Sequence, residues 1–165
     1  MAVEIIKAES DKDFLDIKEY ARIIWNEHYI KILTKDQIDY MTLNFQSEKY
    51  IKHQVLYEGY EYYKLSDSNT PCGYFAIKKE EKALFLSKLY LFLEHRKKGI
   101  ARTVLNFILE YAKKNKLDKI YLTVNKNNKE SIKVYNHLGF RVAKEEVTDI
   151  GSGFVMDDYV MELKV

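Results

Sequence analysis

The most constraining feature of this sequence is one continuous segment, residues 84–114, in which a basic turn joins an apolar strand to an amphipathic helix. The apolar run 83–93 is typical of a buried strand, and Arg96-Lys97-Lys98-Gly99 follows it directly. A strand that delivers backbone amides and positive charge to a helix N-terminus suits a phosphate-bearing ligand. The apolar helix face comprises Ile100, Val104, Leu105, Ile108 and Ala112.

The turn itself has the chemistry of an anion site. Gly99 can adopt backbone angles that other residues avoid, and the amides of residues 97–102 have no partner within a helix that starts there. The helix dipole adds favourable charge, and Arg96, Lys97, Lys98 and Arg102 can add charge-assisted contacts. The motif GxxxxGK[ST] is absent, as is GxGxxG, so neither a P-loop nor a dinucleotide fingerprint is indicated. An ordinary strand-to-helix turn stays the alternative.

Length and composition predict one globular domain over residues 1–165. Hydrophobic residues make up 47% of the 165 residues and charged residues 32%, which excludes a disordered chain. No apolar run approaches the roughly 20 residues that cross a bilayer, and the N-terminus lacks a signal-peptide layout, so no membrane partner is expected. The single Cys72 excludes an internal disulfide framework and a thiolate metal cluster, and favours a cytoplasmic location.

The net charge of +2 is unevenly distributed. The segment 96–119 carries eight Lys/Arg residues against Glu110 and Asp118, which suits an anionic ligand, although a solvated helix face would look the same. A nucleic-acid-binding domain is a rival interpretation, but no recognised binding motif supports it, so we expect no nucleic-acid partner. No metal is expected either, because the histidines lack a ligand spacing; they are His28, His53, His95 and His137.

Periodicity and turn residues predict a mixed α/β chain. The order is one strand, three helices, three strands, then helix, strand, helix and two strands. The predicted segments are a strand at 3–8, a helix from Asp11, a helix behind the capping sequence Thr34-Lys35-Asp36-Gln37, a helix at 47–58, strands at 60–65 and 73–78 joined by a turn at 67–71, the strand 83–93, the helix after Gly99, a strand at 119–124, a helix from Asn127 or Asn128 to Leu138, and strands at 140–147 and 154–163.

Two motifs together point to a known family. The turn R-x-x-G-x-A is followed by N-x-x-S-x-x-x-Y-x-x-x-G-F, and the pair resembles the GNAT superfamily of N-acetyltransferases, as do the element order and the length. The resemblance implies an α/β (α+β) fold: a mixed, mostly antiparallel central sheet flanked by helices, with a splayed central strand. The residues that carry the motifs are Arg96, Gly99 and Ala101, then Asn128, Ser131, Tyr135, Gly139 and Phe140.

The resemblance also implies acetyl-coenzyme A (acetyl-CoA) as co-substrate. The backbone of the central strand would pair with the pantetheine arm, the turn amides would hold the pyrophosphate, and Tyr135 would face the thioester sulfur. Lys97 stands where the family often has glycine, and Ala101 replaces the last glycine. The implied cofactor-binding residues are Leu89, Tyr90, Leu91, Arg96, Lys97, Lys98, Gly99, Ile100, Ala101, Arg102, Asn128, Ser131 and Tyr135.

The implied reaction is direct acetyl transfer to a primary amine of a small molecule, polyamines included, or of a peptide. Tyr135 would be the catalytic residue that assists the leaving thiolate. The proton acceptor stays open, because the central strand carries Ser87 and Lys88 where many relatives carry a glutamate. The candidates are Glu27, His28, Asp157, Asp158 and an ordered water.

The acceptor side is expected at the end of the first helix. Trp25, Glu27, His28 and Tyr29 combine aromatic, acidic and imidazole groups there, and residues 1–60 have a net acidic balance, which suits a cationic acceptor. A helix end with a core tryptophan is the alternative for this segment. At the level of function, the alternative is a non-catalytic acyl-CoA-binding or sensing module on the same fold. The oligomeric state stays open, with a homodimer as one alternative.

Overall fold

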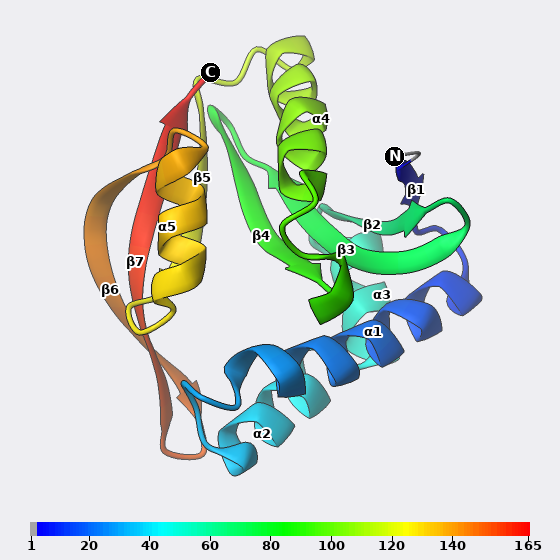
Figure 1. Ribbon diagram of the computed structural model, residues 1–165, viewed down its shortest axis with the longest axis vertical. Coiled ribbons are helices and arrows are strands. Elements are labelled where there is room, and N and C mark those ends of the chain that lie inside the picture. The colour runs from blue at the N-terminus through cyan, green and yellow to red at the C-terminus, as the bar shows by residue number, and fades with distance from the viewer. Residues whose placement is uncertain (1–2) are drawn as a thin grey trace. The chain divides into compact units, whose positions relative to one another are not determined.

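The computed structural model describes residues 3–165, and its element order is the predicted one. The elements are β1 (Val3–Lys7), α1 (Asp11–Tyr29), α2 (Lys35–Phe45), α3 (Glu48–Tyr57), β2 (Tyr60–Asp67), β3 (Thr70–Lys79), β4 (Ala83–Leu91), the 3-10 helix η1 (Leu93–His95), α4 (Ile100–Lys114), β5 (Lys119–Asn125), α5 (Lys129–His137), β6 (Arg141–Gly151) and β7 (Phe154–Lys164) (Figure 1).

The described strands form a seven-stranded sheet in the order β1-β2-β3-β4-β5-β7-β6. It is mixed and mostly antiparallel, with β4 and β5 as the parallel pair, so the predicted fold class is confirmed. The chain divides into two compact units. The first comprises residues 3–78 and 88–103, the second residues 79–87 and 104–165, and β4 and α4 contribute to both.

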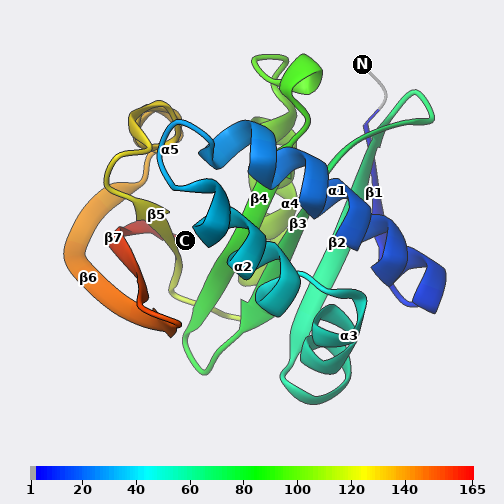
Figure 2. The same cartoon turned by 90° about the horizontal axis from the view of Figure 1, so that it is seen from below.

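In the first unit, β1 pairs antiparallel with β2 and β2 with β3, and α1 and α2 run across one face of β2 and β3 (Figures 1 and 2). Helix α1 begins at Asp11 because the Ser10 hydroxyl accepts the Asp13 amide while the Asp13 carboxylate accepts the Ser10 amide. The Thr34 hydroxyl caps α2 by accepting the Gln37 amide, and the Ser47 hydroxyl caps α3 by accepting the Tyr50 amide. The core of this unit includes Phe14, Ile17, Ile24, Ile38, Ile51, Leu65 and Ile77.

Two boundaries in the first unit differ from the sequence prediction. The β2–β3 turn was predicted at 67–71, but Ser68 and Asn69 take left-handed backbone angles and close a two-residue hairpin turn, so Pro71 lies inside β3. The strand predicted at 83–93 ends at Leu91 instead. The His95 amide donates to the Phe92 carbonyl at 2.9 Å, which turns the chain into η1.

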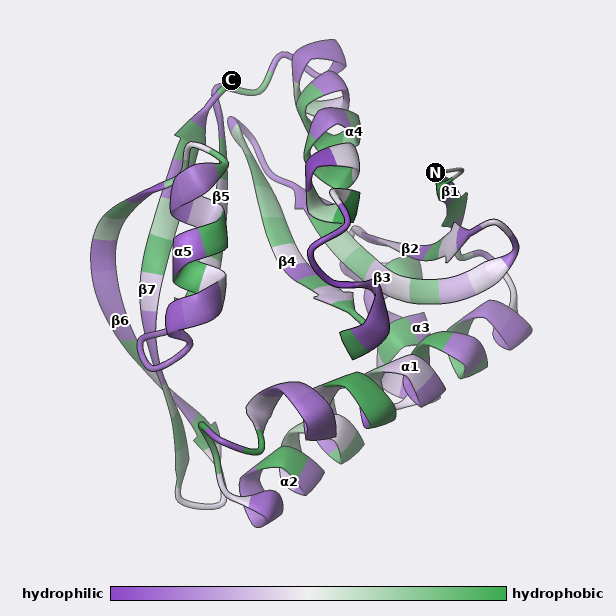
Figure 3. Cartoon of the chain, viewed as in Figure 1, coloured by the Kyte–Doolittle hydropathy of each residue, from purple (hydrophilic) through white to green (hydrophobic). Residues whose placement is uncertain are grey.

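In the second unit, β5 pairs in parallel with β4 from Ala83↔Lys119 to Phe85↔Tyr121 and antiparallel with β7 along its length. Strands β6 and β7 form a hairpin around Ser152 and Gly153, and β6 runs further than the predicted 140–147. Most of β6 is hydrophilic and all its side chains from Arg141 to Asp149 are exposed, so it carries no apolar alternation that would mark its end in sequence (Figure 3).

The two helices of this region match their predicted faces and ends. The predicted apolar residues of α4 are all buried: Ile100, Val104, Leu105, Ile108 and Ala112. Asn128 caps α5, and Gly139 with a φ of 107° ends it before the buried Phe140. In residues 3–165, no helix combines the length and the apolar content that a membrane crossing requires.

Candidate functional site

The basic turn of the first unit presents a row of unpaired backbone amides. Lys97 and Gly99 have φ angles of 61° and 81°, which turns successive amides outward before α4 begins. In the described part of the chain, the amides of Arg96 and Thr103 have acceptors, whereas the six amides between them have none. The turn is the hydrophilic loop that leads into α4 in Figure 3. These amides fit a phosphate group.

The basic side chains of the turn divide into two kinds. Lys97, Lys98 and Arg102 are exposed, so their charges are available to an anion. The Arg96 Nε lies 3.4 Å from the Leu91 carbonyl oxygen and donates to it, which ties the turn back to the end of β4. Lys97 adopts a left-handed φ of 61°, a conformation that glycine adopts at lower cost.

Three of the four predicted acceptor residues gather around Tyr90 of β4, all within the first unit. The hydroxyls of Tyr29 and Tyr90 are 2.9 Å apart, and the Trp25 and His28 rings lie 5.5 and 5.8 Å from the Tyr90 ring. We name these four residues the aromatic cluster. Glu27, the fourth predicted residue, is exposed.

A buried polar network supports the aromatic cluster and was missed from the sequence. The Trp25 Nε1 donates to the Tyr74 hydroxyl at 3.0 Å, and this hydroxyl donates to the Gln46 Oε1 at 2.7 Å. The Gln46 amide in turn donates to the Tyr62 hydroxyl at 3.2 Å. Burial raises the pKa of Tyr74 well above its ordinary value, so the phenol stays neutral. The network therefore holds the Trp25 ring in place. In the sequence, the high count of fourteen tyrosines was the only indication of such a network.

Strand β4 is held close to β3 at the predicted pantetheine residues. A Cβ on Gly73 would lie 2.2 Å from the Tyr90 carbonyl oxygen, so only glycine fits there. Leu89, Tyr90 and Leu91 are each partly buried. Burial lowers the pKa of Lys88 to about 8, so a lysine of reduced basicity stands directly before them.

In the second unit, the loop from β5 to α5 is locked by its own asparagines. The Asn128 amide donates to the Asn125 carbonyl at 2.9 Å, and the Asn125 Oδ1 accepts the Asn127 amide at 2.8 Å. The Asn128 Oδ1 accepts the Ser131 amide at 3.2 Å as the cap of α5. Tyr135 follows on this helix, partly buried, with its ring edge-on to Phe140 at 5.7 Å.

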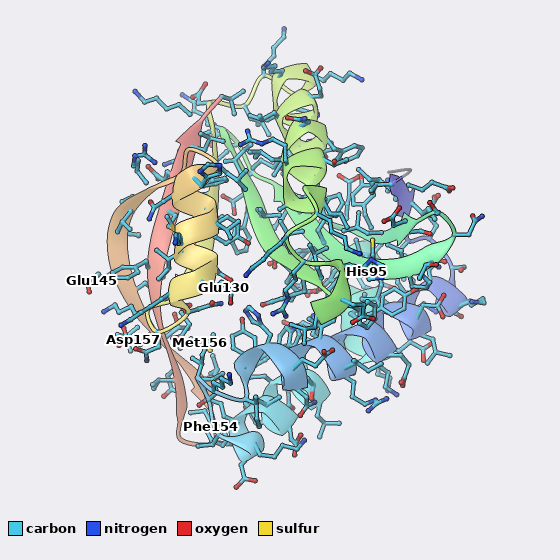
Figure 4. All side chains as sticks on the ribbon, viewed as in Figure 1. His95, Glu130, Glu145, Phe154, Met156 and Asp157 are labelled. Carbon is cyan, nitrogen blue, oxygen red and sulfur yellow. The ribbon has the colours of Figure 1, made fainter. Side chains whose placement is uncertain are left out.

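Among the candidate bases of this unit, the structure separates Asp157 from Asp158. The Lys126 Nζ contacts Asp157 at 2.9 Å and Glu145 at 2.6 Å, and these two carboxylates project from β7 and β6 in Figure 4. Asp158 is 7% exposed, and in residues 3–165 its Oδ1 has no hydrogen-bond donor. Burial raises the pKa of Asp158 to about 6, with Glu146 and Asp157 adding to the shift.

No metal centre is apparent in the part of the chain that the structure describes. A search of residues 3–165 finds no group of three or more His, Cys, Asp or Glu side chains that could hold a metal ion. Cys72 is buried and unpaired, and burial raises the pKa of its thiol to about 11. Such a thiol is a poor nucleophile at neutral pH.

Comparison with known families identifies the class of protein. Residues 19–140 match the model of the acetyltransferase (GNAT) family, which spans both units, and the chain belongs to that family. The family predicted from the two motifs is thus confirmed. No curated protein matches the chain significantly.

Several solved structures share the fold. The PaiA N-acetyltransferase from Thermoplasma acidophilum in complex with coenzyme A is 25% identical, with complete coverage of both chains and a TM-score of 0.82. The ribosomal-protein-S18-alanine N-acetyltransferase from Escherichia coli is 16% identical over 99% of this chain and 94% of its own, with a TM-score of 0.72. The spermidine/spermine N-acetyltransferase SpeG from Vibrio cholerae is 20% identical over 98% and 92%, with a TM-score of 0.67.

The protein is an acetyl-CoA-dependent N-acetyltransferase of the GNAT family. The co-substrate predicted from the sequence motifs is supported by the coenzyme A complex of the similar PaiA enzyme. The basic turn of this structure presents six free backbone amides at the start of α4.

Proposed function

We propose that this enzyme moves the acetyl group of acetyl-CoA directly to a primary amine of a small molecule or peptide, and that residues 1–165 work as one acetyltransferase domain. The free amides of residues 97–102 carry the proposal, because a row of unpaired donors at a helix N-terminus needs an anionic ligand. Ala101 keeps the row open with a small side chain, and Ile100 anchors it through a buried one.

The remaining cofactor contacts follow the chain in both units. The backbone of Leu89–Leu91 pairs with the pantetheine arm, while Asn128 and Ser131 contact its polar groups. The close approach that Gly73 permits holds this part of β4 in place, and the asparagine locks hold the start of α5. Rigid placement of the thioester lowers the entropic part of the barrier to attack.

A glycine variant tests the pyrophosphate assignment. Gly99→Val forces a β-branched residue into a left-handed backbone, which costs about 1–2 kcal/mol. We expect the Kd for acetyl-CoA to rise on the order of tenfold in isothermal titration. Gly153→Val is the matched control, since Gly153 has a φ of 80° in the β6–β7 turn and open space around it. Wild-type affinity in Gly99→Val would remove the pyrophosphate assignment.

The proposed chemistry places Tyr135 at the departing sulfur. The amine attacks the thioester carbonyl, the carbon–sulfur bond breaks, and the Tyr135 phenol gives its proton to the thiolate. Tyr135→Phe keeps the ring and its contact with Phe140 but removes the proton. We expect kcat to fall about 100-fold with little change in acetyl-CoA affinity. An unchanged kcat would eliminate this role.

The aromatic cluster supports a proposal for the acceptor side. Trp25, His28 and Tyr29 present ring faces and edges that can contact an aliphatic ammonium, and Glu27 adds negative charge beside them. The similar structures include enzymes named for a polyamine and for a protein alanine. A primary amine that is cationic in solution, such as a polyamine, is the acceptor class we propose.

The second candidate function is a non-catalytic acyl-CoA sensor, favoured by the lack of a carboxylate on β4, where Ser87 and Lys88 are the polar residues. A panel of amines with a free-thiol readout separates the two. Acetyl-CoA binding without thiol release for any amine would establish the sensor.

We further propose a cytoplasmic location, supported by the unpaired Cys72, and a homodimer, supported by the exposed Val147 and Val155 of the β6–β7 hairpin. Sedimentation equilibrium tests the dimer.

A further inference from the structure

We propose that Asp158 binds the reacting ammonium group of the acceptor, the one that is acetylated, and takes its proton before attack. This inference rests on the proposed transfer to an amine. It assigns the proton acceptor, which the sequence alone did not identify. It assigns the role to a carboxylate on β7 instead of the central strand.

The burial of Asp158 first indicates a missing partner. Its residue is 7% exposed, and the Oδ1 has no donor among residues 3–165. Buried carboxylate oxygens are almost always hydrogen-bonded, because an unpaired buried charge is costly. A buried carboxylate oxygen without a donor is completed by a ligand that donates hydrogen bonds. An ammonium group is such a donor.

The location of Asp158 connects it to the candidate cofactor residues. It lies directly opposite Asn125, the last residue of β5, in the β5–β7 register. The loop that follows is fastened to the same strand, since the Lys126 amide donates to the Asp157 carbonyl at 3.1 Å. This loop ends in Asn128 and leads into the helix of Tyr135. Asp158 therefore lies beside the segment that supplies the proposed acid.

The charges around Asp158 favour a cation. Glu146 of β6 is its direct neighbour in register, Asp157 precedes it on β7, and the facing residue of β5 is the neutral Asn125. Lys126 lowers the pKa of Asp158, but less than burial, Glu146 and Asp157 raise it, and its Nζ contacts Glu145 and Asp157. The surroundings of Asp158 are thus short of one positive charge.

The proton balance of the reaction then closes. The acceptor ammonium gives one proton to the Asp158 carboxylate, and the neutral amine forms a bond to the carbonyl carbon. The carbon–sulfur bond breaks, and the sulfur leaves with the proton of Tyr135. The surplus proton on the new amide nitrogen restores the phenol through solvent, and Asp158 releases its proton to water. One acetylated amine, one free thiol and one proton result.

The test compares three variants on the full chain, with spermidine and an alanyl peptide as acceptors. Asp158→Asn keeps the shape and removes the charge, and we expect kcat/KM to fall at least about 100-fold with acetyl-CoA affinity unchanged. Glu146→Gln removes a negative neighbour that raises the pKa of Asp158, so the acidic limb of its kcat/KM profile, near pH 6 in the wild type, should move to lower pH. Glu145→Gln is the matched control, and the acidic limb of its kcat/KM profile should stay at the wild-type pH.

The outcomes separate this inference from the proposed function. A wild type that releases no thiol with any amine contradicts the proposed function. An active wild type with an equally active Asp158→Asn variant overturns the role of Asp158 alone, as does an acidic limb that Glu146→Gln leaves unmoved. A folding defect is excluded when the thermal midpoint of Asp158→Asn equals or exceeds that of the wild type.

Discussion

The two units differ in whether a cation pairs with their buried or partly buried carboxylates. In the first unit, Asp13 and Asp16 share Lys64, whose Nζ lies 2.7 and 3.0 Å from their oxygens. Burial alone would raise the pKa of Asp13, but hydrogen bonds from Lys64 and from two backbone amides hold it well below the ordinary range. In the second unit, Asp158 has no cation of its own and its pKa is raised.

This contrast separates structural from functional carboxylates. The ion pairs of Lys64 with Asp13 and Asp16 join α1 to β2 and leave no charge unpaired. They therefore stabilise the first unit and provide no unpaired charge to which a ligand could bind. An unpaired buried charge destabilises the fold, and such a cost commonly persists where a ligand is bound. The comparison therefore predicts opposite responses of stability to the removal of charge in the two units.

The largest expected effect on stability comes from Lys64→Met. This change removes the cation and keeps much of the aliphatic stem, so the partly buried Asp13 loses its lysine partner and Asp16 keeps the ion pair with Lys12. We expect the free energy of unfolding at pH 7 to fall by about 2 kcal/mol in urea titrations. Lys52→Met is the control, since its ion pair with Asp11 is exposed, and it should change stability by less than about 0.5 kcal/mol.

The pH dependence of the Lys64 variant sharpens the comparison. The folded pKa values of Asp13 and Asp16 are lowered, so their contribution is present above the unfolded value of 3.8 and is lost as the pH falls through the folded values. The difference between wild type and Lys64→Met should shrink in acid. A difference that stayed constant as the pH fell below 3.8 would show that lost packing, and not lost charge, is responsible.

A smaller effect of opposite sign is expected for Asp158→Asn. The folded pKa is about 6, above the ordinary 3.8, so ionisation penalises the folded state above pH 6 and has no effect below both values. The variant should be more stable than the wild type by on the order of 1 kcal/mol at pH 8, with no gain below about pH 4. Destabilisation at pH 8 would mean that the carboxylate has a structural partner.

The sequence predicted most of the fold because its signals were local. The glycine, the basic residues and the apolar helix face around Gly99 lie within one short segment, and the Asn128 cap lies next to the helix it starts. Contacts between residues far apart in the sequence could not be predicted. Examples are the contact of Tyr29 with Tyr90 and the hydrogen bonds of Gln46. Their partners are set by tertiary packing, which leaves no short-range pattern.

The proton acceptor shows the limit most clearly. Asp157 and Asp158 are neighbours of the same residue type, so the sequence could not rank them. Adjacent strand residues point to opposite faces, and here Asp157 contacts Lys126 while Asp158 is buried. The strand register and the charges of β6 decide between them, and both depend on how β6 pairs with β7.

The central claim is acetyl transfer to a primary amine, and free-thiol release with mass analysis of the acceptor tests it most directly. Wild-type enzyme with acetyl-CoA should release thiol in proportion to acetylated primary amine, and a tertiary amine of equal charge should support neither. Thiol release without an acetylated product, or no release above the rate of hydrolysis with any primary amine, would contradict it.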